Sequence, residues 1–305
     1  MTMTSPITPE INGREALAIE GEAVLIAERI KQKARTRRLG TARSLAARLQ
    51  TLPDGSHLFV RFSRAQCLEH QILMVTFTLL TVTGLLQRYS QFSLIGLIIN
   101  VLGNIDTFRT LHHLTAMVFI LETVYHGLQI LALWFVKRER GGMWPYLRDF
   151  RDLVQMVSFN LGLAKERPEF DRFSIEEKLE YWALLWGTPL MILTGLVMWF
   201  PTIVTSVLPG DAIPISRAIH GWEAILAALA ILTWHMYHTI LKERNHSIFT
   251  GVMTEREMQH LHPLEYRRIL AAHEFLQKMA TEKSTGEDNR IDTEVVLEEA
   301  RYEVV

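Results

Sequence analysis

Cysteine is nearly absent from this sequence of 305 residues, which contains only Cys67. A single cysteine excludes an internal disulfide, a zinc site with several thiolates and an iron–sulfur cluster held by this chain alone. The motif C-x-x-C-H does not occur either, which excludes covalently attached c-type haem. Any such group must therefore belong to another subunit, and we expect Cys67 to be a small apolar residue at a helix start.

Apolar residues are concentrated in the middle of the chain, whereas both ends are polar and charged. Because a helix needs about 20 apolar residues to cross a bilayer, the sequence predicts an all-α fold, an integral membrane four-helix bundle with polar N- and C-terminal extensions. Its expected division is 1–66, a four-span domain at 67–241, and 242–305. The predicted spans are 67–87, 111–136, 179–200 and 215–241.

Three segments outside the spans carry weaker signals. The apolar stretch 91–104 is short and contains glycine, so we expect a re-entrant or interfacial segment. The N-terminus has no basic stretch followed by an apolar core, so we expect no cleavable signal peptide. Residues 15–49 predict a basic, partly amphipathic helix, either on an anionic membrane surface or in solvent or on a partner. We identify no internal repeat.

Basic residues are unevenly distributed among the loops. They are frequent in 29–64 and in 137–172, and scarce in the other two loops away from the span edges. Since basic loops stay on the cytoplasmic side, we expect a multi-pass protein of the inner (cytoplasmic) membrane. Both termini and the long middle loop would then be cytoplasmic, including the acidic tail that begins near residue 281.

Histidines recur within the predicted spans, where they are costly and usually mark function. Paired histidines on facing helices are the means by which a helical bundle holds haem iron. We therefore predict a membrane b-type cytochrome. The five candidate metal ligands are His70, His112, His126, His220 and His235.

Helical geometry groups these histidines by depth. His112 and His126 lie within about 40° and about 21 Å of each other on an ideal helix, and His220 and His235 within about 60° and about 22 Å. Both spans enter from the outer side, so His112 and His220 share the outer depth. His126 and His235 share the inner depth. Two haem b groups with histidine pairs, one near each membrane face, are expected.

His70 competes for the inner position because it lies at about the depth of His126 and His235. Either His126 and His235 bind the inner haem and His70 has another role, or His70 and His235 bind it and His126 supports them. A third haem is the remaining option.

Other residues are candidates for cofactor contacts. Arg109 and Arg217 each precede a histidine by three residues and are placed for haem propionates. Gly127 and Gly221 follow histidines and would let a flat macrocycle approach the backbone. Glu122 is a candidate proton relay or hydrogen-bond partner of a ligand imidazole, and Glu223 is a candidate imidazole partner. His238 is a candidate contact for a haem propionate or a quinone.

The residues around the histidines resemble two known families. R-T-L-H-H-L-T-A (109–116), A-I-H-G-W-E-A (218–224) and W-H-M-Y (234–237) resemble the four-helix core of cytochrome b from quinol–cytochrome c oxidoreductases. Other motifs resemble the gamma or b-type di-haem subunits that anchor formate dehydrogenases and nickel–iron hydrogenases. They are R-F-S-R-A-Q-C-L-E-H-Q (61–71), L-T-V-T-G-L (80–85), E-K-L-E-Y-W (177–182), T-G-L-V-M-W-F-P (194–201), F-T-G-V-M-T-E-R-E (249–257) and H-L-H-P (260–263).

The two resemblances imply different ligand sets. The anchor subunits imply His70, His112, His220 and His235, whereas cytochrome b replaces His70 by His126. The anchor family also implies a quinone pocket that involves the inner haem and the loop entering the third span. That loop reads F-S-I-E-E-K (173–178), where the family tends to have Asn and Gly.

The resulting prediction is a di-haem b subunit of a respiratory oxidoreductase that links a quinone pool to a redox partner on the outer face. Expected partners are membrane lipid, quinone or quinol, and a catalytic, multihaem c-type or iron–sulfur subunit in a hetero-oligomeric complex, with no nucleic acid. The alternative is the cytochrome b subunit of a bc-type complex. A transporter or anchor with proton-relay histidines would show histidines scattered among acidic pairs rather than layered at two depths.

Overall fold

The computed structural model of this protein describes residues 13–137 and 142–285. Parts of three sequence predictions lie outside the described residues: the first twelve residues, loop positions 138–141, and the acidic tail from 286 on. The chain forms two compact units, one of Met1–Leu49 with Arg267–Val305 and the other of Gln50–Tyr266. The first unit contains helix α1 (Gly13–Ala46), which overlaps the predicted basic helix, and most of α11 (Pro263–Thr285).

The second unit contains the membrane-spanning helices. Within the described residues, four helices are long and apolar enough to cross a bilayer, so the four predicted spans are confirmed. Each is a few residues longer than its apolar run at one end or both, because polar residues form its ends. The spans are α2 (Arg64–Arg88), α4 (Ile105–Ala132) continued by η1 (Leu133–Lys137), α6 (Ile175–Trp199), and α8 (Ala212–Ala230) continued by η2 (Ile231–His235) and η3 (Tyr237–Lys242).

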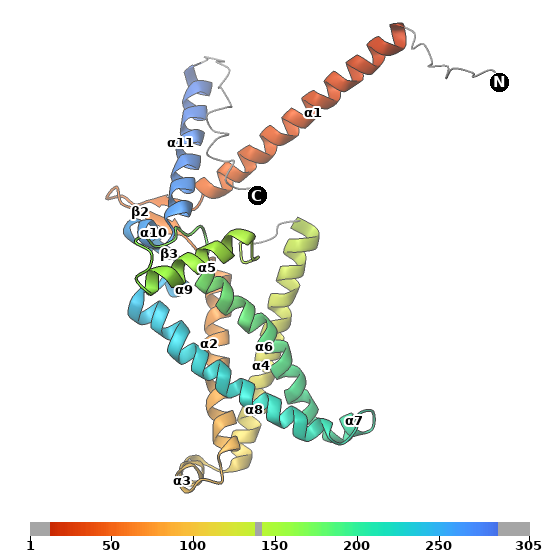
Figure 1. Cartoon of the computed structure of the whole chain (residues 1–305), viewed down its shortest axis with the longest axis vertical. Coiled ribbons are helices and arrows are strands. Elements are labelled where there is room, and N and C mark those ends of the chain that lie inside the picture. The colour runs from red at the N-terminus through yellow and green to blue at the C-terminus, as the bar shows by residue number, and fades with distance from the viewer. Residues whose placement is uncertain (1–12, 138–141, 286–305) are drawn as a thin grey trace, which may run out of the picture. The chain divides into compact units, whose positions relative to one another are not determined.

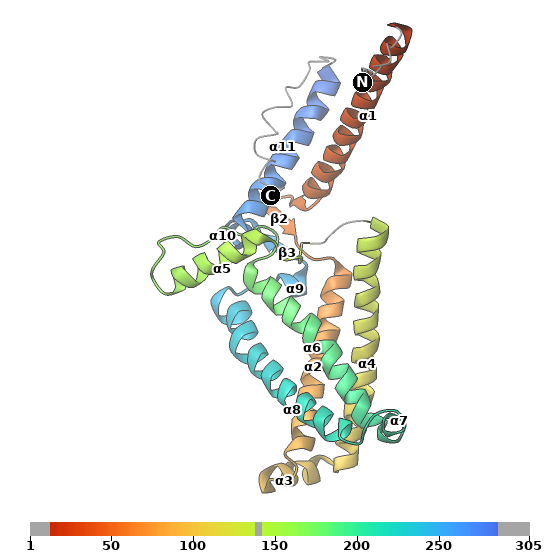
Figure 2. The same ribbon diagram turned by 45° about the vertical axis from the view of Figure 1, so that its right-hand side comes forward.

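The four spans form two antiparallel helix pairs. Helix α2 packs along α4, and α6 packs along α8 (Figures 1 and 2). Two short helices, α3 (Ser93–Leu102) and α7 (Pro201–Thr205), connect the helices of each pair at one end of the bundle, which we call the α3/α7 end. With ten residues, α3 is too short to span. Helices α2 and α6 both begin at the opposite end.

The opposite end carries a small sheet, and we call it the sheet end. The strands β1 (Leu49–Thr51), β2 (His57–Val60) and β3 (Val252–Thr254) follow the order β1-β2-β3. In the antiparallel register of β2 with β3, Phe59 opposes Met253, and both side chains are fully buried. The sequence predicted only a polar extension after residue 241. Instead, α9 (Ser247–Thr250), β3 and α10 (Glu255–Leu261) fold there.

Helices α2 and α6 begin with the same device. Ser63 accepts a hydrogen bond from the backbone N–H of Gln66, whose side chain accepts one from the N–H of Ser63. Ser174 and Glu177 repeat this capping box at the start of α6. Each box satisfies backbone N–H groups that lack a partner in the first turn.

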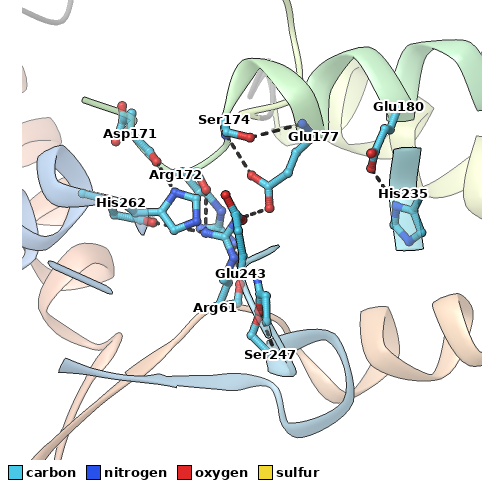
Figure 3. A network of polar contacts seen from close by, with 12 residues as sticks. Arg61, Asp171, Arg172, Ser174, Glu177, Glu180, His235, Glu243, Ser247 and His262 are labelled. Atoms are coloured by element: carbon cyan, nitrogen blue, oxygen red, sulfur yellow. Dashed lines mark hydrogen bonds and ion pairs between the residues drawn. The ribbon is translucent and has the colours of Figure 1, made fainter. Parts of the chain in front are cut away.

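Two arginines join the starts of these helices. The Arg61 guanidinium donates to the carbonyl of Arg172 at 2.5 Å, and Arg172 donates back to the carbonyl of Arg61 at 3.0 Å (Figure 3). Arg61 is buried, and its charge is compensated by Glu177 at 2.7 Å. The segments before α2 and α6 are therefore held together by reciprocal bonds.

Helix α5 (Leu147–Asn160) lies at the same end and is fixed to the start of α6. Its Asp149 forms a buried ion pair with Lys178, at 2.7 and 2.8 Å. Met156 packs with Phe170 and Ile175 in a small apolar cluster. The loop that enters the third span is thus tied down by both charge and packing.

His262, between α10 and α11, makes the sheet end sensitive to acid. Burial, with a smaller contribution from Arg61, lowers the pKa of His262 to about 4, and its Nδ1 donates to the carbonyl of Asp171 at 2.7 Å. The unfolded chain therefore binds the proton more readily, so stability is lost as pH falls from about 6.5 to about 4. At pH 5 the expected loss is about 2 kcal/mol.

The measurement is amide hydrogen exchange in α10 at pH 7 and pH 5, corrected for the intrinsic rate. His262→Asn should remove most of this pH dependence. The matched control is His260→Asn, because His260 is an exposed histidine of α10 itself, two residues before His262. Equal pH dependence in both variants would contradict the assignment to His262.

Candidate functional site

The first histidine pair lies toward the α3/α7 end. The rings of His112 on α4 and His220 on α8 face each other with centroids 6.4 Å apart. Thr83 on α2 lies 2.9 Å from Nδ1 of His112, and Thr194 on α6 lies 3.0 Å from Nδ1 of His220. Each helix pair thus supplies one histidine and the threonine that orients it.

The threonines also determine the tautomer of these rings. Thr83 donates its hydroxyl proton to the carbonyl of Leu79 at 2.6 Å, and Thr194 donates to that of Leu190 at 2.7 Å. Each hydroxyl oxygen is therefore left to accept from the imidazole Nδ1–H. The lone pair of each Nε2 is then available to a metal, as in sites where the second nitrogen donates to a fixed partner.

Glycines beside the threonines make room for the two rings. A Cβ atom at Gly84 would lie 3.3 Å from Cε1 of His112, and one at Gly195 would lie 3.3 Å from Cε1 of His220. Both contacts are tighter than ordinary van der Waals separation. These glycines were not among the residues expected from the sequence, although the repeated Thr-Gly in the first and third spans is a signal that indicates them.

The second pair lies toward the sheet end. The rings of His70 on α2 and His235 in η2 have centroids 6.2 Å apart. His235 Nδ1 donates to the Glu180 carboxylate at 2.7 Å (Figure 3). Nδ1 of His70 is buried and has no hydrogen-bond partner within residues 13–137 and 142–285. His235 lies in a π-helical turn, a wider turn that often occurs at functional positions.

His126 has different neighbours. Its Nδ1 donates to Glu69 at 3.0 Å, and the hydroxyl of Tyr181 lies 3.5 Å from its Nε2. Gln129 also donates to Glu69, at 2.9 Å. Of the two histidines that the sequence left in competition, the structure places His70 opposite His235.

Both pairs have the separation that one metal ion between two imidazoles requires. With metal–nitrogen bonds of about 2 Å and about 1.1 Å from each nitrogen to its ring centre, two ligands on opposite sides have centroids about 6 Å apart. The observed 6.4 and 6.2 Å agree with this value. In their separation, the two pairs of imidazoles therefore fit a haem iron held between two histidines.

The predicted arginine and glycine contacts are distributed differently. Arg109 is exposed and pairs with Asp106, whereas Arg217 lines a pocket at the α3/α7 end together with Arg88. The guanidinium of Arg88 lies over Gly221, where a Cβ atom would overlap it, and over the Trp222 ring. The sequence led us to expect a haem macrocycle against Gly221, but the side chain of Arg88 lies at that position. A Cβ atom at Gly127 would have no neighbour within 4 Å.

The remaining candidates lie beside the pairs rather than in them. Glu122 is half-buried, with His126 and Glu69 as its electrostatic neighbours. The carboxylate of Glu223 lies against Gly187, so it is not the imidazole partner that the sequence suggested; a threonine takes that place. His238 donates to the carbonyl of Trp234 at 2.9 Å and packs on its ring.

Comparison with known proteins decides the family. The family model described as prokaryotic cytochrome b561 matches residues 61–251, more than half of the chain. The chain belongs to this family. It is a membrane b-type cytochrome, a helical bundle that carries haem b and transfers electrons, as the sequence predicted. A search of curated proteins found no match.

Proposed function

We propose that this cytochrome holds two haem b groups and conducts electrons across the membrane between a quinone pool and a redox partner subunit. His112 and His220 would hold the haem at the α3/α7 end, and His70 and His235 the haem at the sheet end. The two facing pairs carry this proposal. Haem supplies reversible one-electron chemistry, and the chain supplies its ligands and surroundings.

The spacing of the pairs suits conduction across a bilayer. His220 and His235 belong to one continuous span and are separated by about 22 Å along an ideal helix, against a hydrocarbon core of about 30 Å. Two haems at these depths would bring each membrane face within reach of one redox group. We accordingly propose an inner-membrane location, with the basic loops and both termini on the cytoplasmic side.

Arginines at the α3/α7 end would receive haem propionates. Arg88 and Arg217 line one pocket at the α3/α7 end, the same end as the His112–His220 pair, and Arg forms strong charge-assisted bonds with carboxylates. Arg109 would contribute less because Asp106 already pairs with it. Arg88 is thus added to the arginines expected from the sequence to contact haem propionates.

We propose that quinone binds near His126 at the sheet end. The imidazole is 38% exposed and has a carboxylate, Glu69, behind it. A histidine with a carboxylate partner can hold or release a proton next to a redox group, which quinone chemistry requires. Glu122 precedes His126 by four residues on α4, so both side chains lie on one face of the helix.

The partner would be a catalytic subunit in a hetero-oligomeric complex. The resemblance to b-type subunits of nickel–iron hydrogenases supports this assignment, as does His70, which that resemblance implies as a ligand and which faces His235. The substrate of the complex would then be handled outside this chain.

The haem content of the purified protein tests the proposal directly. The pyridine haemochrome spectrum should give two b haems per polypeptide, and quinol should reduce both in lipid nanodiscs. One haem, or none, would contradict the paired assignment.

Glu180 is expected to lower the midpoint potential of one haem. Its carboxylate accepts from Nδ1 of His235, which makes the imidazole a stronger donor and favours the oxidised metal. Glu180→Gln should raise that potential by about 60 mV, since about 1.4 kcal/mol corresponds to about 59 mV for one electron. A redox titration followed at the haem absorption band measures the change.

The matched control is Glu223→Gln, which alters a half-buried carboxylate on α8 that lies against Gly187 rather than on a ligand imidazole. It should change both potentials far less. A shift of the same size in both variants would assign the effect to general electrostatics.

A further inference from the structure

Helices α2 and α6 carry the same residues in the same order. The shared residues start at an arginine before each helix and end near its last turns, with equal spacing throughout. They are R-F-S at 61–63 and 172–174, L-E at 68–69 and 179–180, and T-G-L at 83–85 and 194–196. This corrects the expectation that the sequence contains no internal repeat.

The contacts of these residues repeat as well. Thr83 orients His112 on its partner helix α4, as Thr194 orients His220 on its partner helix α8. Each of the two helices also begins with a capping box. The arginine before each helix donates to the backbone carbonyl of the other arginine (Figure 3). The α2–α4 pair and the α6–α8 pair are thus two copies of one helix pair.

The carboxylates extend the correspondence to the sheet end. Glu69 on α2 bonds His126 on α4 at 3.0 Å, and Glu180 on α6 bonds His235 on α8 at 2.7 Å. His126 and His235 are therefore equivalent positions of the two copies. Each has a carboxylate from its own helix pair on Nδ1.

Their facing partners come from the opposite copy. His70, directly after Glu69, faces His235 with ring centroids 6.2 Å apart. Tyr181, directly after Glu180, faces His126, also at 6.2 Å. The sheet end therefore has two equivalent ring pairs of equal separation, which differ in one residue: tyrosine stands where the other copy has histidine.

We infer that His126 and position 181 form a second, latent haem-ligand pair, and that Tyr181 directs the sheet-end haem to His70 and His235. This inference rests on the proposed haem ligation. A phenol that donates its proton to Nε2 of His126 occupies the lone pair a metal would need. An imidazole at position 181 also has an unprotonated nitrogen, which offers a metal ligand at the required separation.

The test is to move the haem from one pair to the other. In the full chain, His70→Ala should reduce the haem content from two per polypeptide to one. Adding Tyr181→His should restore it to two, and adding His126→Ala to that variant should return it to one. The control is His70→Ala with Tyr181→Phe, which removes the hydroxyl without supplying a nitrogen and should stay at one.

The haem at the α3/α7 end reports folding in every variant. If it is retained and His70→Ala/Tyr181→His still holds one haem, the inference is overturned. Restored haem that survives His126→Ala would also overturn it, because the ligand would then come from elsewhere. A wild-type chain with one haem contradicts the proposed function instead, and the inference falls with it.

Discussion

Replacing His220 by alanine is expected to leave the protein with one haem instead of two. The ring of His220 is oriented by Thr194, packs against Gly195 and faces His112 at 6.4 Å. Without it, the haem that this pair would hold at the α3/α7 end loses one of its two protein ligands. The pyridine haemochrome spectrum should show the loss of half the haem.

The matched control is His113→Ala. His113 adjoins His112 in sequence but stacks on Trp199 with ring centroids 4.1 Å apart, so its loss should leave both haems in place. A His220→Ala protein that retains two haems would rule out the His112–His220 pair. Loss of both haems in His113→Ala would indicate a folding defect at this end and would not support the assignment.

The two histidines that the sequence left in competition should give opposite results when removed. His70→Ala is expected to lose the haem at the sheet end, because His70 faces His235. His126→Ala is expected to keep two haems, because its ring is held by Glu69 and Tyr181 instead. In the second variant, quinol-dependent haem reduction should fall by about a hundredfold or more, the typical loss on removing an acid–base group.

Haem content and reduction rate together separate these roles. Gln129→Ala serves as the control for His126→Ala, since it removes another partner of Glu69 without removing an ionisable ring. It should keep the haems and most of the rate. If His126→Ala loses a haem and His70→Ala does not, the ligand set of cytochrome b applies in place of the proposed one.

The spans were predictable because the length of an apolar run is a property of the sequence alone. Which histidines of different helices face each other was harder to predict from the sequence. The equal depth of His112 and His220 follows from spacing, and their rings do lie together, although haem ligation by them stays a prediction. At the other end, spacing gave His126 and His70 the same depth. Which of them faces His235 depends on helix rotation, and His235 lies in a π-helical turn that an ideal α-helix does not represent.

Other features depend on residues distant in sequence. The roles of Glu69 and Glu180 could not be predicted without knowing which helix lies alongside. A carboxylate in a span is costly unless it is paired, and its partner here lies on another helix. The strands β1, β2 and β3 have three or four residues each, too few for a periodic pattern to be recognised. The helix-pair repeat was visible in R-F-S, L-E and T-G-L, and was missed because the matching residues are sparse.

The reciprocal bonds between Arg61 and Arg172 have a consequence for how the bundle opens. Each guanidinium holds the backbone of the other copy, so neither helix pair can tilt at the sheet end without breaking bonds on both. Local opening there should involve both pairs in one cooperative event, with the free energy of a sub-global unfolding unit. The two helix pairs would then move together, because the starts of α2 and α6 are joined.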